Sequence, residues 1–468
     1  MNASTLIDKI WSAHRVVSLG DDVDLLYIDR IFLHERTGSI ALRSLADAGR
    51  QVRNPRAVFV TIDHIVETTP GRRHSSRMPG GEVFIEATRQ SARAAGVTLF
   101  DSDDPRQGIV HVVSPEQGIA LPGVTLVCPD SHTSTVGGLG ALAWGIGSSD
   151  AEHALATQTL AMKRPPQTRV RFDGHLGSGA RAKDLILYLI GQYGAAGGAG
   201  HAIEFAGSAI EALDVEGRFT LCNMAVEFGA WTGIVAPDDR TIEYVQGRTW
   251  APGGAQWDAA LAYWRTLRSD EEARFERELA IDARDVKPQV TWGTSPQQVI
   301  AIGDPVPPAP VGGGRGQEEA ARRALEYMGL NPGDRLTEYP IDAAFIGSCT
   351  NSRLTDLREA AAVLRGRRVA AGVRALCVPG STVVKKAAEE EGIDRVFKDA
   401  GFEWHEAGCS MCFYAGGATF PPGSRVISST NRPFEGRQGP GVRTHLASPA
   451  TVAASAILGR IGHAGELS

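Results

Sequence analysis

The sequence predicts an α/β protein with parallel-rich sheets, and three observations point to this class. Short apolar runs with the composition of buried strands recur along the chain, at residues 57–62, 124–128, 343–346, 374–378 and 425–429. Helical patterns alternate with these runs, and each run ends in polar or glycine-rich residues. Alternating strands and helices form parallel sheets, whose ligands lie beyond the carboxyl ends of the strands. The polar residues at these strand ends are therefore the candidates for function.

The first two of these strands end in acidic residues and histidines. The run AVFVTI ends in Asp63 and His64, and the run VTLVC is followed by Asp130, Ser131 and His132. An isolated Asp-His pair is more often an ordinary surface turn. At a strand end, however, a histidine held by a carboxylate is the usual device for a proton donor with a fixed tautomer and a raised pKa.

A glycine-rich run, TSTVGGLGALAWGIGSS, follows His132. Such a run resembles a phosphate loop only weakly, and the lysine that a P-loop requires is missing, so we reject a nucleotide site. We expect the glycines to admit a bulky ligand. A capping box from Ser149 to Glu152 then predicts a helix over EHALATQTLAMK. Further along, the charged stretch 268–285 predicts a solvated helix face.

A proline- and glycine-rich stretch at 302–316 predicts a linker between an N-terminal part, 1–301, and a C-terminal domain, 317–468. The segment EEAARRALEYMG, with Gly329 as its C-cap, predicts the first helix of that domain. The segments TDLREAAAVLRGR and VVKKAAEEEG predict helices that follow the strands at 343–346 and 374–378.

Composition excludes several classes of protein. The 468 residues exceed one domain, and the net charge of -6 argues against nucleic acid as a partner. No apolar run reaches membrane-spanning length and no signal pattern opens the chain, so we expect a soluble, cytoplasmic protein. Six cysteines are too few for a disulfide scaffold. Three of them, Cys128, Cys222 and Cys377, have apolar neighbours and are interpreted as buried small hydrophobes.

The other three cysteines have the surroundings of metal ligands. Cys409 and Cys412 form a Cys-x-x-Cys pair, which alone fits a redox pair, half of a zinc site or an iron–sulfur ligand pair equally well. Cys349, just after a strand end, supplies a third thiolate. Structural zinc sites normally need four protein ligands, whereas three thiolates hold an iron–sulfur cubane and leave its fourth iron open. Arg432 and Arg437 follow closely and could bind carboxylates bidentately, although exposed arginines are often only solvated charges.

Several segments together resemble the aconitase superfamily and, within it, the isopropylmalate dehydratases. They are LLYIDRIFLHE, GSCTN around Cys349, GCSMC at Cys409 to Cys412, NRPFEGRQG from Asn431 and THLASPATVAASA near the C-terminus. The resemblance covers nearly the whole chain, and the motifs follow in the expected order. It implies three similar α/β domains around a central iron–sulfur cluster, without the swivelling fourth domain. Two of these domains would lie within 1–301.

The resemblance also implies roles for individual residues. A 4Fe–4S cluster would be held by Cys349, Cys409 and Cys412. His132 would pair with Glu227 and Asp130 with His111, while Asp63 and His64 help to protonate the departing hydroxyl. The expected catalytic residues are Asp63, His64, His111, Asp130, Ser131, His132 and Glu227, and the expected substrate-binding residues are Asn223, Asn431, Arg432 and Arg437.

The implied activity is a hydro-lyase that isomerises a hydroxy acid, 2-isopropylmalate, in leucine biosynthesis. The serine base of the resembled enzymes lies on the missing fourth domain, so a separate small subunit is expected as partner. Departures from the family pattern flank the site: Ile-Val-Glu-Thr after His64, Pro129, residues 413–418 and Pro433. These departures remove none of the expected ligands, so they affect the choice of substrate more than the type of reaction. The alternatives are a hydro-lyase for a smaller alkylmalate, such as 2-methylmalate or citraconate, and an iron-responsive binding protein.

Overall fold

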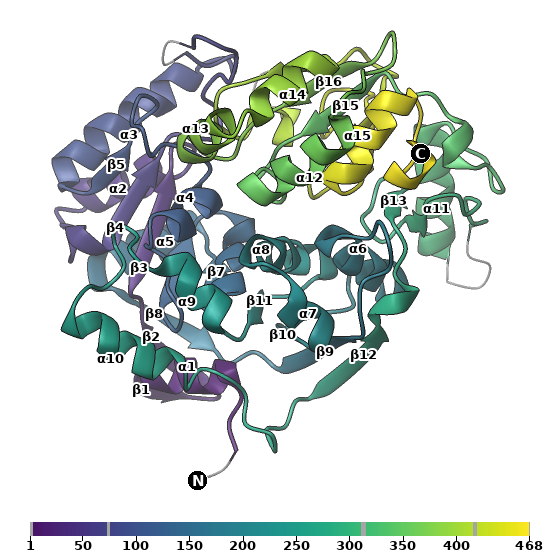
Figure 1. Ribbon diagram of the computed structural model, residues 1–468. Coiled ribbons are helices and arrows are strands. Elements are labelled where there is room, and N and C mark those ends of the chain that lie inside the picture. Colours follow the sequence, from purple (N-terminus) through teal and green to yellow (C-terminus); the bar gives the residue numbers. More distant parts are fainter. Residues whose placement is uncertain (1–2, 73–74, 310–314, 415–418, 468) are drawn as a thin grey trace. The chain divides into compact units, whose positions relative to one another are not determined.

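The computed structural model describes residues 3–72, 75–309, 315–414 and 419–467, and the chain divides into two compact units (Figure 1). Unit 1 comprises residues 1–66, 79–175 and 198–282. Unit 2 comprises residues 67–78, 176–197 and 283–468. Within the described residues, each unit has its own parallel sheet and its own hydrophobic core. The α/β class is therefore confirmed, whereas the division into three similar domains stays a prediction.

Unit 1 contains two parallel sheets and one antiparallel sheet. The five-stranded parallel sheet has the order β5 (Thr98–Phe100), β4 (Val58–Thr61), β3 (Arg30–His34), β6 (Thr125–Cys128), β7 (Leu142–Gly145). The four-stranded parallel sheet has the order β11 (Thr232–Val235), β10 (Ala202–Ala206), β9 (Gln167–Asp173), β12 (Arg277–Asp282). The antiparallel sheet has the order β1 (Arg15–Gly20), β2 (Val23–Tyr27), β8 (Thr159–Lys163).

The helices of unit 1 connect and cover these strands. They are α1 (Leu6–His14), α2 (Gly38–Asp47), α3 (Gly81–Ala95), α4 (Val110–Glu116), α5 (Ser148–Thr157), α7 (Ser208–Ala212), α8 (Val215–Met224), α9 (Asp239–Val245) and α10 (Ala255–Trp264). Short 3-10 helices are η1 (Pro55–Ala57), η2 (Ser131–Leu139) and η3 (Ala225–Phe228). Three neighbouring strands each place a phenylalanine, Phe32, Phe59 and Phe100, in one stack with ring centroids 6.0 to 6.5 Å apart. The phenylalanines pack on one face of the sheet, and the alternate residues Ile31, Leu33, Val58 and Val60 belong to the core on the other face.

Unit 2 is built around a second five-stranded parallel sheet. Its order is β17 (Phe402–Trp404), β16 (Arg374–Cys377), β15 (Ala343–Ile346), β18 (Arg425–Ser428), β19 (Arg443–Leu446), and β13 (Gln289–Thr291) pairs with β14 (Val299–Ala301). The helices are α6 (Ala182–Tyr193), α11 (Arg315–Met328), α12 (Leu354–Leu364), α13 (Thr382–Glu390), α14 (Ile393–Ala400) and α15 (Pro449–Leu458). The 3-10 helices are η4 (Ala283–Asp285), η5 (Leu336–Glu338), η6 (Ser410–Cys412) and η8 (Ala464–Leu467).

All five strands predicted from apolar runs are present, but two helix predictions are wrong. α5 begins at Ser148 behind the N-cap Gly147, so the capping box at Ser149 is not formed. Gln158, with a φ of 55°, ends this helix, and the residues that follow pair with β2 as strand β8. The charged stretch 268–285 contains β12, which pairs with β9 at the sheet edge and exposes its alternate residues. Charged side chains along an exposed edge strand mimic a solvated helix face.

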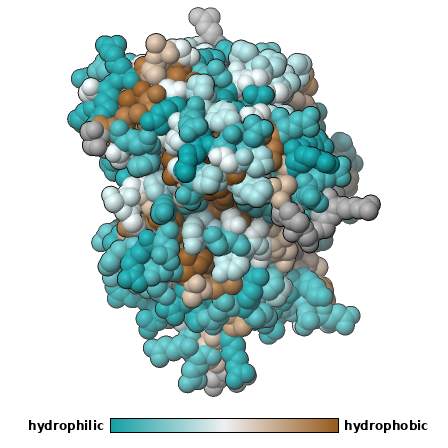
Figure 2. All heavy atoms as spheres, turned by 90° about the vertical axis from the view of Figure 1, so that its right-hand side faces the viewer, coloured by the Kyte–Doolittle hydropathy of each residue, from teal (hydrophilic) through white to brown (hydrophobic). Residues whose placement is uncertain are grey.

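One face of the described surface is mainly hydrophilic (Figure 2). On the face shown in Figure 2, hydrophilic side chains dominate and hydrophobic residues form separate patches. Among the described residues, no helix combines the length and apolarity that a membrane crossing needs. Residues 310–314 of the predicted linker and residues 415–418 of the segment that departs from the family pattern lie outside the described residues.

Candidate active site

The first candidate pair follows strand β4 in unit 1. Asp63 is fully buried, and its carboxylate lies 2.7 Å from Nδ1 of His64. Nε2 of the same ring lies 3.1 Å from Asp130. Both ring nitrogens thus face carboxylate oxygens, an arrangement that needs two N–H donors and favours the imidazolium. Burial alone would lower the pKa of His64, but Asp63 and Asp130 outweigh it and raise that pKa well above 6.5.

Asp130 connects three histidines at the end of strand β6. Its Oδ1 lies 2.8 Å from Nε2 of His111, at the start of α4, and accepts the backbone N–H of His132 at 2.8 Å. Its Oδ2 contacts His64. Burial would raise the pKa of Asp130, but the histidines around it hold that pKa well below its usual value. Asp130 is therefore an anion that fixes the positions of several possible proton carriers.

The second expected pair is also present within unit 1. Nε2 of His132 lies 2.8 Å from Oε1 of Glu227, which belongs to η3, and both side chains are buried. Ser131 is exposed, and its hydroxyl lies 3.2 Å from Nδ1 of His132. We name the connected set Asp63, His64, His111, Asp130, His132 and Glu227 the histidine–carboxylate network.

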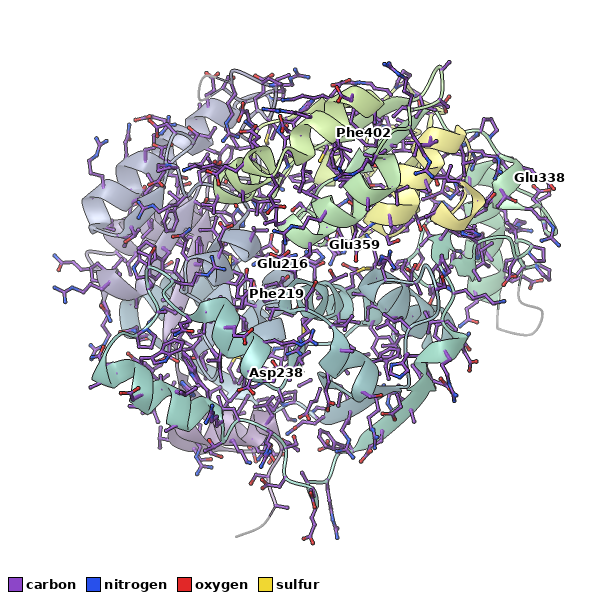
Figure 3. The ribbon with its side chains drawn as sticks, viewed as in Figure 1. Glu216, Phe219, Asp238, Glu338, Glu359 and Phe402 are labelled. Atoms are coloured by element: carbon purple, nitrogen blue, oxygen red, sulfur yellow. The ribbon has the colours of Figure 1, made fainter. Side chains whose placement is uncertain are left out.

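Helix α8 packs against η2 and supplies Asn223, whose side-chain nitrogen donates to the Thr135 hydroxyl at 2.8 Å. The glycines of this region have a packing role that the sequence analysis did not foresee. A Cβ on Gly138 would meet the ring of Phe219 on α8 at 2.7 Å. Phe219 is labelled in Figure 3. A Cβ on Gly145 would meet the carbonyl oxygen of Asp130 at 2.6 Å. The glycines thus let unit 1 pack closely on itself, which corrects the expectation that they admit a ligand.

The three candidate cluster cysteines lie in unit 2 at strand ends and in one tight turn. Cys349 follows β15. Cys409 precedes η6 and Cys412 is its last residue, and the Cys412 N–H donates to the Cys409 carbonyl at 2.8 Å. All three are buried, and none is bridged in a disulfide. Ser348 and Ser410, each next to a cysteine, have φ values of 83° and 47°. Non-glycine residues in this region carry backbone strain, which is concentrated at functional sites.

Polar groups of unit 2 point at the sulfur atoms. The Ser348 hydroxyl lies 3.1 Å from Sγ of Cys412 and 3.9 Å from Sγ of Cys349. The Asn431 amide donates to Sγ of Cys349 at 3.6 Å, and Arg437 donates to Sγ of Cys412 at 3.3 Å. Arg437 also donates to Oδ1 of Asn431 at 3.1 Å. We name these residues, with Cys409, the cysteine–arginine cluster.

The donors of the cysteine–arginine cluster fit an anionic, sulfur-ligated group. Thiolates are the ligands of iron–sulfur clusters, and N–H donors around the sulfurs stabilise the negative charge that such clusters carry. Arg437 and Asn431 supply these N–H groups, and both are buried. Arg432, next to Asn431, is half-buried. The arrangement therefore suits a cluster bound by three cysteines better than a buried pair of neutral thiols.

Three buried ionisable residues were not singled out from the sequence. Lys183 lies on the apolar helix α6 and donates to the carbonyls of Ser429 and Thr430, at 2.5 and 2.6 Å, just before Asn431. Burial lowers the pKa of Lys183 to about 7. His34 is the last residue of strand β3, and Glu35 follows it. A lysine within an apolar helix and a polar pair directly after an apolar strand are the sequence signals that could have found them.

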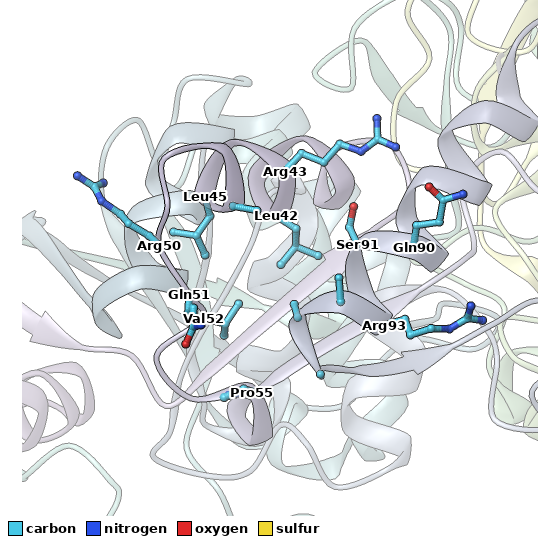
Figure 4. Close-up of a pocket in the computed structure, with 14 residues that line it drawn as sticks. Leu42, Arg43, Leu45, Arg50, Gln51, Val52, Pro55, Gln90, Ser91 and Arg93 are labelled. Atoms are coloured by element: carbon cyan, nitrogen blue, oxygen red, sulfur yellow. The ribbon is translucent and has the colours of Figure 1, made fainter.

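One cavity of unit 1 has a lining that includes none of these residues. It has a volume of about 600 Å³ and is lined from α2 and α3 and the segments that follow each helix (Figure 4). Leu42, Leu45 and Val52 form part of its lining, and Arg43 and Arg93 stand at its edge. None of the predicted site residues lines it, so this cavity gives no support to the candidate chemistry.

Comparisons with known proteins find relatives of nearly the whole chain. The family model described as the aconitase family (aconitate hydratase) matches residues 8–459. The protein "3-isopropylmalate dehydratase large subunit 1" of Bradyrhizobium diazoefficiens is 53% identical over 462 residues, covering 98% of this chain and 95% of that protein. Thermococcus kodakaraensis aconitase X is a distant structural likeness, with a TM-score of 0.45, 14% identity and coverage of 87% of this chain and 84% of that one.

The family follows from the sequence matches alone. The family model spans nearly the whole chain, and the relative at 53% identity aligns with almost all of it. Such a match leaves no long segment that would need a different ancestry. The chain therefore belongs to the aconitase family.

Proposed function

We propose that this chain is the large subunit of a 3-isopropylmalate dehydratase, a hydro-lyase that interconverts 2-isopropylmalate and 3-isopropylmalate. The observation that carries the proposal is 53% identity over 98% of the chain to a relative of that name. The histidine–carboxylate network supports it, because dehydration needs a proton donor for the departing hydroxyl. A purely iron-sensing protein would have no use for such a network.

We infer that Cys349, Cys409 and Cys412 hold a 4Fe–4S cluster. Three thiolates leave one iron of such a cluster open, and an open iron acts as a Lewis acid on a hydroxyl group. The N–H groups of Asn431 and Arg437 support this ligand set, because they donate toward the sulfurs of Cys349 and Cys412.

Within unit 1, His64 is the proposed proton donor. An imidazolium between Asp63 and Asp130 carries the proton that the departing hydroxyl requires, and the two carboxylates stabilise the charged ring until that proton is transferred. His132 is the second proton carrier, oriented by Glu227. Asp130 holds His64 and His111 in place, and Ser131 extends the polar surface beside His132.

In unit 2 we assign Arg432, Arg437 and Asn431 to the substrate carboxylates, because guanidinium and amide N–H groups match carboxylate oxygens. Asn223 in unit 1 is assigned to the substrate as well. No residue in these sets is left to remove the carbon-bound proton. We therefore propose a separate small subunit as the source of the base, in agreement with the words "large subunit" in the relative's name.

The test is reconstitution of activity under anaerobic conditions. The 468-residue chain would be assayed alone and co-expressed with a small subunit, against isopropylmaleate, citraconate and cis-aconitate. Activity of the complex on isopropylmaleate, with none from the single chain, is the expected result. Preferential hydration of citraconate would show that the substrate is a smaller alkylmalate. Robust turnover by this chain alone would overturn the two-subunit proposal.

A further inference from the structure

Strand β3 is the central strand of the five-stranded sheet in unit 1, between β4 and β6. The neighbours of β3 lead into Asp63 and His64 on one side and Asp130 on the other. β3 itself leads into His34 and Glu35, which have no role in the proposed reaction. Both side chains are buried, at 3% and 0% exposure. Burial of two ionisable groups at the centre of a catalytic edge needs an explanation.

Glu35 holds the backbone on both sides of His64. One carboxylate oxygen accepts the N–H of Ile65 at 2.7 Å, and the other accepts the N–H of Asp63 at 3.1 Å. A carboxylate with two such bonds restrains the short peptide segment between them. The direction in which the His64 ring leaves the chain is therefore set by Glu35.

His34 contacts the His64 ring itself and the peptide before Asp130. Its Nε2 donates to the carbonyl of Pro129, the residue before Asp130, at 3.1 Å. Its ring stacks on that of His64, with centroids 4.0 Å apart and planes 22° apart. Burial and the charge of His64 lower the pKa of His34 to about 4, so this ring is neutral. A neutral ring stacked on an imidazolium restrains its tilt without adding a second charge.

The same four side chains, His34, Glu35, Asp63 and His64, place ligand atoms within 4.8 Å of one another, a spacing that a metal ion could also use. Their oxygens are already engaged, however. Both oxygens of Glu35 accept backbone N–H groups, and those of Asp63 contact His64 and accept the Val110 N–H at 3.0 Å. A cation would have to replace these bonds, so the geometry favours a scaffold over a metal site.

We infer that His34 and Glu35 are positioning residues, which fix the ring of His64 and the peptide before Asp130 in the geometry for proton transfer. The inference rests on the proposed function, since it takes His64 as the proton donor. Glu35 acts on the backbone and His34 on the ring plane. Loss of either side chain leaves the imidazole of His64 present but changes its orientation. A misplacement of about 1 Å can cost roughly 10²-fold in rate.

The experiment compares matched variants in the complex of both subunits. Glu35→Gln keeps the shape but loses one of the two acceptors. His34→Phe keeps a ring for stacking but loses the donor to Pro129, and His34→Gln keeps a donor but loses the ring. Glu82→Gln and His153→Phe, both at exposed positions of unit 1, are the controls.

The first readout is the split between kcat and KM for isopropylmalate, at full iron content. We expect kcat to fall by roughly 10- to 100-fold in Glu35→Gln and His34→Gln, with KM changed by less than about threefold. The second readout is the ring nitrogen resonances of His64 in ¹⁵N-histidine-labelled protein, assigned by their loss in His64→Gln. These resonances should shift in Glu35→Gln and His34→Gln and stay unchanged in both controls.

The two readouts separate this inference from the proposed function. Shifted His64 resonances in a protein that turns over no isopropylmalate would support the positioning role while the function fails. Unchanged resonances and unchanged kcat in both Glu35→Gln and His34→Gln would overturn the inference. His34→Phe guards against misfolding of the other variants, because it is expected to fold and to show an intermediate loss of kcat.

Discussion

The two candidate clusters, one in each unit, differ in the groups that meet. In the histidine–carboxylate network of unit 1, histidine nitrogens lie 2.7 to 3.1 Å from carboxylate oxygens. In the cysteine–arginine cluster of unit 2, N–H donors point at sulfur atoms, and two serines hold strained φ values. The network joins histidines to carboxylates within the protein. The cysteine–arginine cluster directs N–H donors at thiol sulfur atoms, an environment that favours an anionic, sulfur-ligated group.

This difference separates the kinds of damage that substitutions should cause. Removing a member of the network leaves a buried charge without its partner, so the loss falls on proton transfer and on the free energy of unfolding. Under the proposed ligand set, removing Cys349, Cys409 or Cys412 would remove a metal ligand, so the loss should fall on the metal content. Metal content and the pH dependence of activity are the measurements that distinguish damage to the network from damage to the cysteine–arginine cluster.

The largest expected effect is in the cysteine–arginine cluster. Cys349→Ala, Cys409→Ala and Cys412→Ala should each abolish the visible absorption and paramagnetic signals of the cluster, and all activity with them, because a cubane loses one of its three protein ligands. Iron analysis and electron paramagnetic resonance of anaerobically purified protein are the measurements. Cys377→Ala is the matched control, since Cys377 is equally buried but lies within strand β16.

Retention of a full iron complement by all three variants would show that the ligands are assigned wrongly. Loss of iron in Cys377→Ala would show instead that any buried cysteine in unit 2 disturbs the site. Either result would remove the expected difference between substitutions in the network and substitutions in the cysteine–arginine cluster.

The next largest effect is in the network. His132→Ala should keep the cluster and the circular dichroism spectrum while kcat/KM falls by roughly 10²- to 10⁴-fold, the range for a lost acid–base group. The physical reason is that Glu227 then orients no proton carrier. His153→Ala, at an exposed position on α5, should leave kcat/KM unchanged. If His132→Ala remained fully active, His132 would have no part in proton transfer.

A smaller effect concerns the protonation of His64. Asp63→Asn removes a carboxylate that raises the pKa of His64, so the imidazolium should lose its proton at lower pH than in the parent protein. The alkaline limb of the profile of kcat/KM against pH should then move to lower pH. Asp47→Asn, at an exposed position on α2, is the control and should leave the limb unchanged.

The same pKa difference has a consequence for folding. A histidine whose pKa is higher in the folded state than its unfolded value of about 6.5 stabilises the fold fully below pH 6.5. That contribution is lost as pH rises through the raised value, by about 1.4 kcal/mol for each unit of pKa elevation. Urea unfolding at a series of pH values in this range should show that the free energy of unfolding falls more steeply with pH in the parent protein than in His64→Gln. Equal slopes would mean that His64 is not held as an imidazolium.

The sequence predicted the parts of the site that follow a simple rule and missed those that do not. Asp63, Asp130 and Cys349 directly follow apolar strands, and parallel sheets gather such strand ends at one edge. His34 and Glu35 obey the same rule after the strand IFL, yet the short motif was used only for the family resemblance. Their partners are backbone N–H groups and a ring face, and a sequence does not show which backbone groups a side chain will meet.

The wrong helix at 268–285 has a similar cause. The exposed edge strand β12 carries Arg277, Glu278 and Asp282 within a stretch rich in charge, which resembles a solvated helix face, and only pairing with β9 decides between them. The glycines after His132 were predicted to surround a ligand, whereas Gly138 and Gly145 meet protein atoms of unit 1. Close packing between α8 and η2 depends on segments about 80 residues apart, which local patterns do not connect.

The smallest expected effect tests whether Asn223 belongs to the packing of unit 1 alone. Its amide donates to Thr135 at 2.8 Å, and Thr135 in turn donates to the carbonyl of His132. Asn223→Ala should lower the free energy of unfolding by about 1 kcal/mol, the net value of one hydrogen bond. A double-mutant cycle with Thr135→Val should show coupling of about 0.5–1.5 kcal/mol, since both changes remove the same bond. Coupling with Thr88→Val, whose hydroxyl bonds elsewhere on α3, should stay within about 0.5 kcal/mol.

Kinetics of the same Asn223→Ala variant decide its second assignment. If Asn223 also binds substrate, KM for isopropylmalate should rise while kcat is largely kept, because binding common to the ground and transition states is lost. Thr135→Val removes the hydrogen bond without removing the amide, so its KM should rise less. An equal KM in Asn223→Ala and the parent protein would leave Asn223 as a packing residue between α8 and η2. The substrate carboxylates would then depend on the arginines and Asn431 of unit 2.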